Sequence, residues 1–172
     1  TQIGAGTTSL TGANTYSGTT TISTGTLSIG AGGATGALGT GATTNNATLQ
    51  FNRTGALTVA SAISGTGVVN QIGTGTTTLT GANSYSGTTT ISAGTLNVGG
   101  AGAGGTLGTG AVVNNATLII DRSDAAFTVA NSISGTGALT KTGAGTNTVL
   151  TLTGTNSYSG TTTITEGTLQ IG

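Results

Sequence analysis

The chain has 172 residues, of which 34 are glycine and 44 are threonine, and it contains no cysteine, histidine, proline, methionine or tryptophan. Three basic and three acidic residues leave a formal net charge of zero, which excludes a basic surface for nucleic acid and a polybasic membrane patch. Without cysteine and histidine there are no disulfides, no soft metal ligands and few possible nucleophile–base pairs.

The composition favours ordered β structure over disorder. Mean hydropathy is +0.22, whereas disordered chains usually combine low hydrophobicity with high net charge. Leucine, isoleucine and valine occur in short alternating runs, and threonine is itself β-branched and suits a pleated strand. No stretch shows a helical period, and glycine at this density disfavours helices. The sequence therefore predicts an all-β fold.

The expected strands of the chain up to Ile72 are short and are separated by Gly, Asn and Ser. Thr20 and Ile22 share one face by alternation, as do Leu57 and Val59. Alternation fails within Val68–Ile72, so we expect a bulge there. In chain order we predict strands at Thr7–Thr11, Thr19–Ser23, Thr26–Ile29, Ala47–Phe51, Leu57–Ile63 and Val68–Ile72.

One motif occurs three times, at Thr11–Ser28, Thr80–Asn97 and Thr153–Gln170, each with the core Tyr-Ser-Gly-Thr-Thr-Thr-Ile. Its tyrosines are Tyr16, Tyr85 and Tyr158, so the second spacing is slightly longer than the first. The second repeat carries one extra residue between Asp121 and Phe127, and three more residues enter near Asn147–Leu150. We interpret residues 1–172 as a single segment of a longer chain, with repeats at about 1–69, 70–139 and, in part, 140–172.

A repeat of short strands predicts a solenoid, and we favour a right-handed parallel β-helix with a sandwich or barrel as the alternative. Coils of roughly twenty residues give on the order of eight coils and a length of about 40 Å. The predicted core includes Leu27, Ile29, Leu49 and Phe51, while the three tyrosines are expected in loops that lean over the coil edge. A repeat also disfavours an enzyme, because a catalytic site needs different groups at one place.

The pattern Lys-Thr-Gly-Ala-Gly-Thr, followed by Leu-Thr-Leu-Thr-Gly and the motif, is complete at Lys141–Gly172. It resembles the passenger-associated transport repeat of bacterial autotransporters, and Ile3–Gly30 and Ile72–Gly99 share the resemblance. The lysine of the first box is replaced here by Gln2 and Gln71. The segments between these boxes, Ala31–Asn70 and Gly100–Leu139, are weaker matches that resemble the spacers of adhesin-like passengers.

The resemblance implies a structural stalk in a secreted or surface-exposed adhesin passenger, anchored in the parent by an outer-membrane barrel. It also implies that coil-by-coil folding supports export, and that a host or surface ligand is bound elsewhere in the parent. We expect no enzymatic activity, no catalytic, cofactor or metal residues, no cofactor, no nucleic-acid partner and no membrane insertion by this segment. The alternative is a surface-binding module, for ice or carbohydrate, that uses outward Thr and Asn faces.

The one charge cluster is Asp121, Arg122 and Asp124. Spaced carboxylates can bind calcium or act as a glycosidase pair. The first repeat has Asn52 and Gly55 at the two acidic positions, so a repeated site would be missing there. We therefore interpret the cluster as a solvated turn with a local ion pair.

Three further patterns have a structural interpretation. The glycines of Gly99–Gly105 are not followed by the Gly-Lys-Ser/Thr of a phosphate loop and indicate a turn. Glycosylation sequons at Asn46, Asn52 and Asn115 are expected by chance in this composition. The outward pairs at Thr19/Thr21, Thr88/Thr90 and Thr161/Thr163 resemble an ice-binding row, but they return only about every third coil.

Finally, the segment begins and ends inside a repeat, so we expect partners to include neighbouring repeats or copies of itself. Exposed strand edges at either end invite head-to-tail pairing or aggregation.

Overall fold

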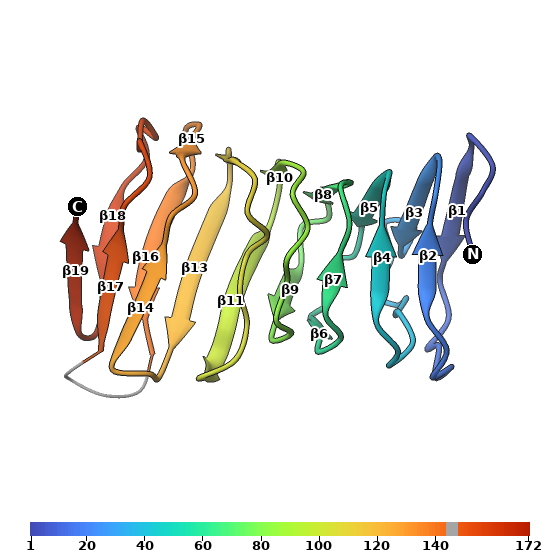
Figure 1. The fold of residues 1–172 in the computed structure, drawn as a ribbon, viewed down its shortest axis with the longest axis horizontal. Helices are drawn as coiled ribbons and strands as arrows, with labels where there is room; N and C mark the ends of the chain where they lie inside the picture. The colour runs from blue at the N-terminus through green and yellow to red at the C-terminus, as the bar shows by residue number, and fades with distance from the viewer. Residues whose placement is uncertain (144–147) are drawn as a thin grey trace.

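The computed structural model describes residues 1–143 and 148–172, and in this part of the chain every regular element is a β-strand (Figure 1). The strands pair in parallel with strands of the neighbouring coils and form a solenoid of about eight turns. The two chain ends lie at opposite ends of the rod (Figure 1). The predicted all-β parallel β-helix is confirmed, and the sandwich or barrel alternative is wrong.

The described strands form four sheets that run along the rod, and we name them A to D. Sheet A contains β2 (Thr20–Ile22), β4 (Thr43–Asn45) and β7 (Ile63–Ser64). Sheet B contains β1 (Thr7–Leu10), β3 (Thr26–Ile29), β5 (Thr48–Phe51), β8 (Val68–Gln71), β10 (Thr89–Ile91), β12 (Val112–Asn114) and β15 (Ile133–Ser134). Sheet C contains β6 (Leu57–Val59), β9 (Thr76–Leu79), β11 (Thr95–Gly102), β13 (Thr117–Arg122), β16 (Ala138–Thr142) and β18 (Thr162–Ile164). Sheet D contains β14 (Ala126–Val129), β17 (Val149–Leu152) and β19 (Thr168–Ile171).

Sheets A and D cover the same side of the rod, because two non-strand segments connect them by hydrogen bonds. The backbone N–H of Ser84 donates to the carbonyl of Ile63 in β7, and the side-chain amide of Asn83 donates to the carbonyl of Thr106. The Asn131 amide, just after β14, donates to the carbonyl of Gly108. Each coil therefore has three faces: sheet B, sheet C, and the side shared by sheets A and D, which we call the A/D face.

Successive repeats place the same motif on successive faces. The Thr-Thr-Ile strand is β2 in sheet A, β10 in sheet B and β18 in sheet C. The Thr-Leu strand that follows is β3 in sheet B, β11 in sheet C and β19 in sheet D. One repeat thus spans three coils and one further face, or three and a third coils. The expectation that the motif returns about every third coil misses this rotation.

Most predicted strands are present, with three differences. The strand expected over residues 57–63 is divided into β6 and β7, and β4 was not predicted, because its Thr-Thr-Asn sequence contains no aliphatic residue. The bulge predicted at Val68–Ile72 is wrong. β8 pairs with β5 in continuous register, and alternation is hidden in the sequence because the inward residue Gln71 is polar. The register shift of the described strands instead lies in β11, between Val98 and Gly102.

The core is a narrow column of inward aliphatic side chains stacked from coil to coil. The predicted members Leu27, Ile29, Leu49 and Phe51 are at most 4% exposed. Leu49 pairs with Leu27 on one side and Val69 on the other, so each apolar residue is covered by the coils before and after it. Burial of one such side chain stabilises the fold by about 1.5–3 kcal/mol. Continuity of the column is therefore what holds the rod together.

The added residue between Asp121 and Phe127 lies where β13 turns into β14. The insertion expected near Asn147–Leu150 begins at Asn147, which lies outside the described residues.

Candidate functional site

Gln71 occupies an inward position of β8 and is 1% exposed. Its side-chain Nε2 donates to the carbonyls of Gly73 and Gly75, at 2.8 and 3.2 Å, and its Oε1 accepts from the Thr77 hydroxyl at 2.7 Å. Gln2 makes the equivalent contacts with Gly4, Gly6 and Thr8. Every polar atom of this amide is satisfied, so the residue fastens the next turn inside the coil.

Lys141 is the lysine of the first box in the third repeat, and it is also buried, at 1% exposure. Its Nζ donates to the carbonyl of Thr142 at 2.8 Å and to the Thr148 hydroxyl at 2.9 Å. The first-box residue, which is glutamine in the first two repeats and lysine in the third, is therefore a buried residue that hydrogen-bonds the turn after it.

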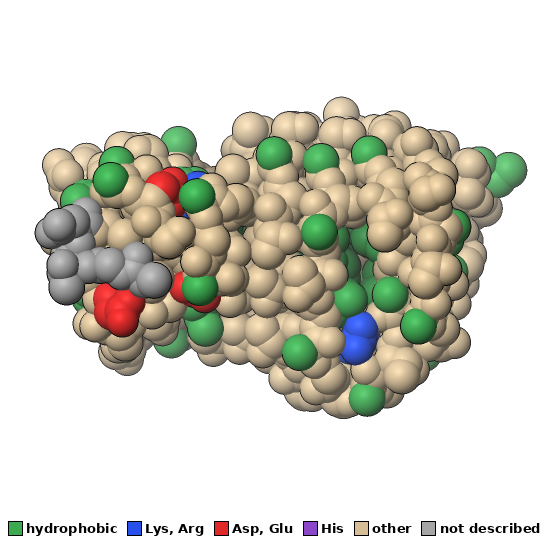
Figure 2. Space-filling model, turned by 90° about the horizontal axis from the view of Figure 1, so that it is seen from below, with side chains coloured by type: hydrophobic (Ala, Val, Ile, Leu, Met, Phe, Trp, Pro, Cys, Tyr) green, Lys and Arg blue, Asp and Glu red, His purple; other side chains and the backbone are tan. Residues whose placement is uncertain are grey.

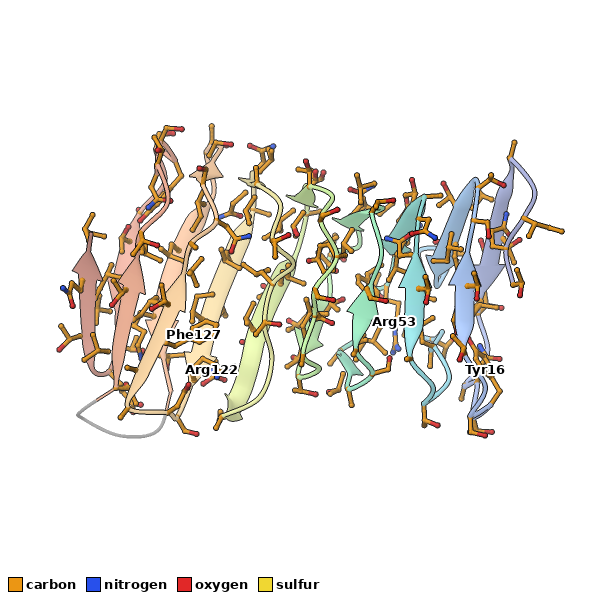
Figure 3. All side chains as sticks on the ribbon, viewed as in Figure 1. Tyr16, Arg53, Arg122 and Phe127 are labelled. Carbon is orange, nitrogen blue, oxygen red and sulfur yellow. The ribbon has the colours of Figure 1, made fainter. Side chains whose placement is uncertain are left out.

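Tyr85, in the middle of the rod, lies in the interior, which corrects for this residue the expectation that the tyrosines lean over the coil edge. Tyr85 is fully buried, whereas Tyr16, in the first coil, is 39% exposed at the end of the rod (Figure 3). Each tyrosine hydroxyl shares a 2.8 Å hydrogen bond with the threonine four positions later, as Tyr85 does with Thr89. Burial raises the pKa of the Tyr85 phenol, and the Thr89 hydrogen bond offsets part of that effect.

Arg53 and Arg122 occupy equivalent positions of the first and second repeats and hold the glycine-rich turns of the coils before them (Figure 3). Arg53 donates to the carbonyls of Ala34 and Gly36, and Arg122 donates to those of Gly104 and Gly105. The geometry of Gly99–Gly105 differs from that of a phosphate loop. The turn directs carbonyl oxygens at an arginine, whereas a phosphate loop directs N–H groups at an anion.

The predicted ion pair is present between Arg122 and Asp124, but Arg122 is buried, so the prediction that this cluster is solvated is wrong for the arginine. Two hydrogen bonds of 2.9 and 2.8 Å join the guanidinium to the carboxylate, and they lower the pKa of Asp124. The guanidinium carbon of Arg122 also lies 4.1 Å from the ring centre of Phe127, a cation–π contact (Figure 3). Each guanidinium nitrogen donates at least one hydrogen bond within the fold, and Asp121 is not part of the pair. No cluster of three or more acidic residues that could hold a metal occurs in residues 1–143 or 148–172.

The outward threonine pairs do not form a continuous row. Thr19/Thr21 flank sheet A, Thr88/Thr90 lie at sheet B and Thr161/Thr163 at sheet C, because the repeat rotates by one face. Within sheet B, Thr90 is flanked by Asn70 and Val113. The three Thr-x-Thr pairs therefore do not stack on one another, and the structure does not favour the ice-binding alternative.

Two grooves missed in the sequence lie at equivalent places in the two full repeats. The first, of about 200 Å³, lies between residues 38–40 and 58–61, and the second, of about 260 Å³, lies between residues 106–109 and 127–131 beside Asn83. Their shared signal is Leu-Gly-Thr followed one coil later by Thr-Val-Ala. The residues that line the two grooves are neutral. Each groove is lined in part by the strand that ends its sheet, β6 in sheet C or β14 in sheet D.

The sequon asparagines Asn46 and Asn115 serve the turns. Each side-chain Oδ1 accepts a hydrogen bond from a backbone N–H of the next coil, at Thr66 and Thr136. Charged side chains are sparse on the face shown in Figure 2, which is mostly backbone and uncharged polar side chains with scattered apolar groups. The described side chains therefore offer shape and neutral hydrogen bonding, with no convergent acid, base or nucleophile.

Two comparisons with known proteins match this chain to autotransporter passengers. The profile of the passenger-associated-transport-repeat matches residues 1–29, 69–98 and 139–171, which together make up more than half of the chain. The chain is also similar to the adhesin BmaC autotransporter of Brucella suis biovar 1 (strain 1330), with 41% identity over 158 residues. That match covers 80% of this chain but 4% of the relative.

No solved structure matches the chain. Among the described residues no helix is long and apolar enough to cross a bilayer. The three matched ranges coincide with the three copies of the motif and with the strands that rotate from face to face. The chain belongs to the passenger-associated-transport-repeat family of autotransporter passengers.

Proposed function

We propose that this chain is a stalk segment of a surface-exposed or secreted autotransporter adhesin, which holds a distal region away from the cell. The observation that carries the proposal is the role of the repeated residues. The repeated glutamine or lysine, tyrosine and arginine all make hydrogen bonds within or between coils. Residues with these contacts stabilise the rod itself.

We also propose that coil-by-coil folding supports export of the passenger. Each coil pairs only with the coils before and after it, so every coil added to a folded end gains its own backbone ladder and its own part of the aliphatic column. Each exported coil is therefore held outside by the free energy of its own folding.

The segment is proposed to be non-enzymatic, without catalytic, cofactor or metal residues of its own. Its neutral surface and the three-way distribution of its threonines support this. Its partners are proposed to be the coils stacked on it, with any host or surface ligand bound by another part of the parent protein.

The test uses a full-length protein that carries this segment. Deletion of residues 70–139, one whole repeat, should shorten the rod by about 16 Å, three and a third coils at a strand spacing of about 4.8 Å. Electron microscopy measures the length, flow cytometry with a distal tag measures export, and cell binding measures adhesion. Export and adhesion are expected to persist.

The matched comparison replaces Leu118, which is fully buried, with Asp. If folding drives export, this variant reduces the amount of tagged passenger at the surface several-fold. A loss of adhesion after the repeat deletion, with normal export and an intact distal region, would instead show that the segment itself binds the ligand and would overturn the stalk assignment.

A further inference from the structure

The arginines of the two full repeats hold their glycine-rich turns through the same nitrogen. Nη1 of Arg53 donates to the carbonyl of Gly36, and Nη1 of Arg122 donates to that of Gly105, the counterpart of Gly36 in the second repeat. Arg122 turns the other edge of its guanidinium, Nε and Nη2, to the carboxylate of Asp124. The second arginine therefore has a counter-ion within its own repeat.

The same edge of Arg53 lacks a carboxylate, because the residue at the place of Asp124 is Gly55. Nε of Arg53 is buried and has no hydrogen-bond partner, and Nη2 donates to the carbonyl of Ala34 at the surface. A buried N–H group without a partner is unfavourable, and one acidic side chain can satisfy Nε and Nη2 together. The edge of Arg53 is therefore one carboxylate short of the arrangement found at Arg122.

The sequence around Arg53 supplies no counter-ion. Arg53 is half-buried, and it is the one residue with a charged side chain among residues 1–120. The acids of the chain all follow later, at Asp121, Asp124 and Glu166. On the face shown in Figure 2 acidic groups lie toward the C-terminal end of the rod, and the basic group in the other half has none beside it. A counter-ion for Arg53 therefore comes from outside this segment.

We propose that Arg53 is a docking site for an acidic side chain of another polypeptide, whose carboxylate takes the position that Asp124 takes at Arg122. One carboxylate oxygen accepts from Nε and the other from Nη2, as in the second repeat, where these distances are 2.9 and 2.8 Å. The carboxylate displaces the Ala34 carbonyl from Nη2, and that carbonyl lies at the surface, where water replaces the lost hydrogen bond. Since Nε is buried, a small outward shift of the side chain accompanies binding.

This site goes beyond the proposed stalk function, because it gives the rod a lateral attachment point while the main surface ligand is bound elsewhere in the parent. A single ion pair near the surface is a weak contact. In a stretch of 120 residues with no other charged side chain, however, it fixes where along the rod an acidic partner sits.

The experiment uses the fact that the chain has two arginines and therefore two Nε–H signals in a nitrogen-15 magnetic resonance spectrum. Arg53→Lys removes one of these signals and so assigns it. The probe is the end-blocked peptide Ser-Asp-Ala, copied from residues 123–125, and its matched control is Ser-Asn-Ala, which differs in the carboxylate alone. Glucuronate is the third ligand and tests an acidic sugar in place of a peptide.

Two variants exchange the acid between the repeats. An ideal Cβ on Gly55 would lie 3.5 Å from Nη2 of Arg53, so a side chain at this position begins beside the guanidinium. Gly55→Asp should therefore close the site at Arg53, and Asp124→Gly should open the equivalent site at Arg122. The second variant adds no atoms to the fold, so it keeps the test valid if the first variant does not fold.

We expect the Arg53 signal to move saturably with the Asp peptide, with an affinity at least about tenfold higher than for the Asn peptide, while the Arg122 signal stays in place. In Asp124→Gly the Arg122 signal should respond as well. The inference is wrong if the Arg53 signal does not move, or if both signals move alike with either peptide. Tighter binding of glucuronate than of the Asp peptide would overturn the assignment to a polypeptide.

Discussion

The ring and carbonyl of Tyr85 lie directly against Gly108 of the next coil, and the phenol hydroxyl is tied to Thr89 of its own coil. This pairing places a bulky aromatic residue inside a narrow rod, because the neighbouring coil contributes no side chain at the point of contact. The same arrangement recurs between Tyr16 and Gly39. Each of the two full repeats thus contacts the spacer that follows it through a tyrosine and a glycine.

Replacement of Gly108 with Val should therefore unfold the central coils. A Cβ atom there would overlap both the carbonyl oxygen and the ring of Tyr85, and overpacking of this kind costs about 1–3 kcal/mol or more. The measurement is urea denaturation followed by circular dichroism. Gly33→Val is the matched control, because a Cβ on Gly33 meets nothing within 4 Å, and its midpoint should stay close to that of the parent chain.

Burial of Tyr85 predicts a loss of stability at high pH. Its pKa is raised in the folded state, so above pH 10 the unfolded chain releases the phenolic proton more readily than the folded chain does. Stability from this group is complete below pH 10 and declines as pH rises toward the folded pKa. Melting temperatures from pH 8 to 11.5 should fall more steeply for the parent than for Tyr85→Phe. Parallel curves would contradict the assignment of the effect to this tyrosine.

The Gln71 clamp predicts a cost that hydrophobicity alone would not suggest. Gln71→Leu is about the same size and more apolar, yet it leaves the carbonyls of Gly73 and Gly75 and the Thr77 hydroxyl without their partner. Unsatisfied buried groups cost about 1–3 kcal/mol each, so we expect a net loss of about 2 kcal/mol in the free energy of unfolding. Asn70→Leu, on the outward side of the same strand, serves as control and should change it by less than about 0.5 kcal/mol.

Position along the rod should decide the effect of core truncation. Leu118 is fully buried between two coils, so Leu118→Ala should cost about 2–5 kcal/mol. Ile164 also belongs to the column, but it is 50% exposed in the last coil, and Ile164→Ala should cost under half as much. Equal losses in chemical denaturation would show that the last coil is as well covered as the middle ones.

The Arg122–Asp124 pair predicts acid sensitivity with a defined sign. Hydrogen bonds from Arg122 lower the folded-state pKa of Asp124 below 3.8, so its stabilising effect is present above that value and is lost as pH falls through the folded pKa. Asp124→Asn should flatten the stability profile below about pH 4 and cost up to about 1 kcal/mol at pH 7. An unchanged profile would show that the carboxylate contributes nothing.

Sequence pattern alone predicted the fold class, most strands and the core residues Leu27, Ile29, Leu49 and Phe51, because alternation and repetition are local signals. It did not predict which face each strand joins. That depends on the number of residues in every turn, and a difference of a few residues between coils decides whether a motif returns to its own face or to the next one. For this reason the rotation of the repeat became visible only when the structure showed which sheet each strand joins.

The inward polar residues were missed for a different reason. Gln71 and Arg122 are residue types that are mostly exposed, and tyrosine is intermediate. The burial of their polar groups becomes favourable only when particular carbonyl and hydroxyl groups of neighbouring turns surround them. Those groups are brought close by stacking, not by proximity in sequence. The Leu-Gly-Thr-Gly of each spacer was the available signal, since a glycine at the same spacing after a tyrosine in both repeats marks a close approach.

The rotation of the repeat by one face also bears on the straightness of a long rod. Each full repeat contains one wide glycine-rich turn, after β3 in the first repeat and at the end of β11 in the second. If these turns always fell on one face, that side would be thicker in every repeat and the irregularity would accumulate as curvature. In this chain the two turns follow strands of different sheets, sheet B and sheet C, so their irregularities do not add up on one side of the rod.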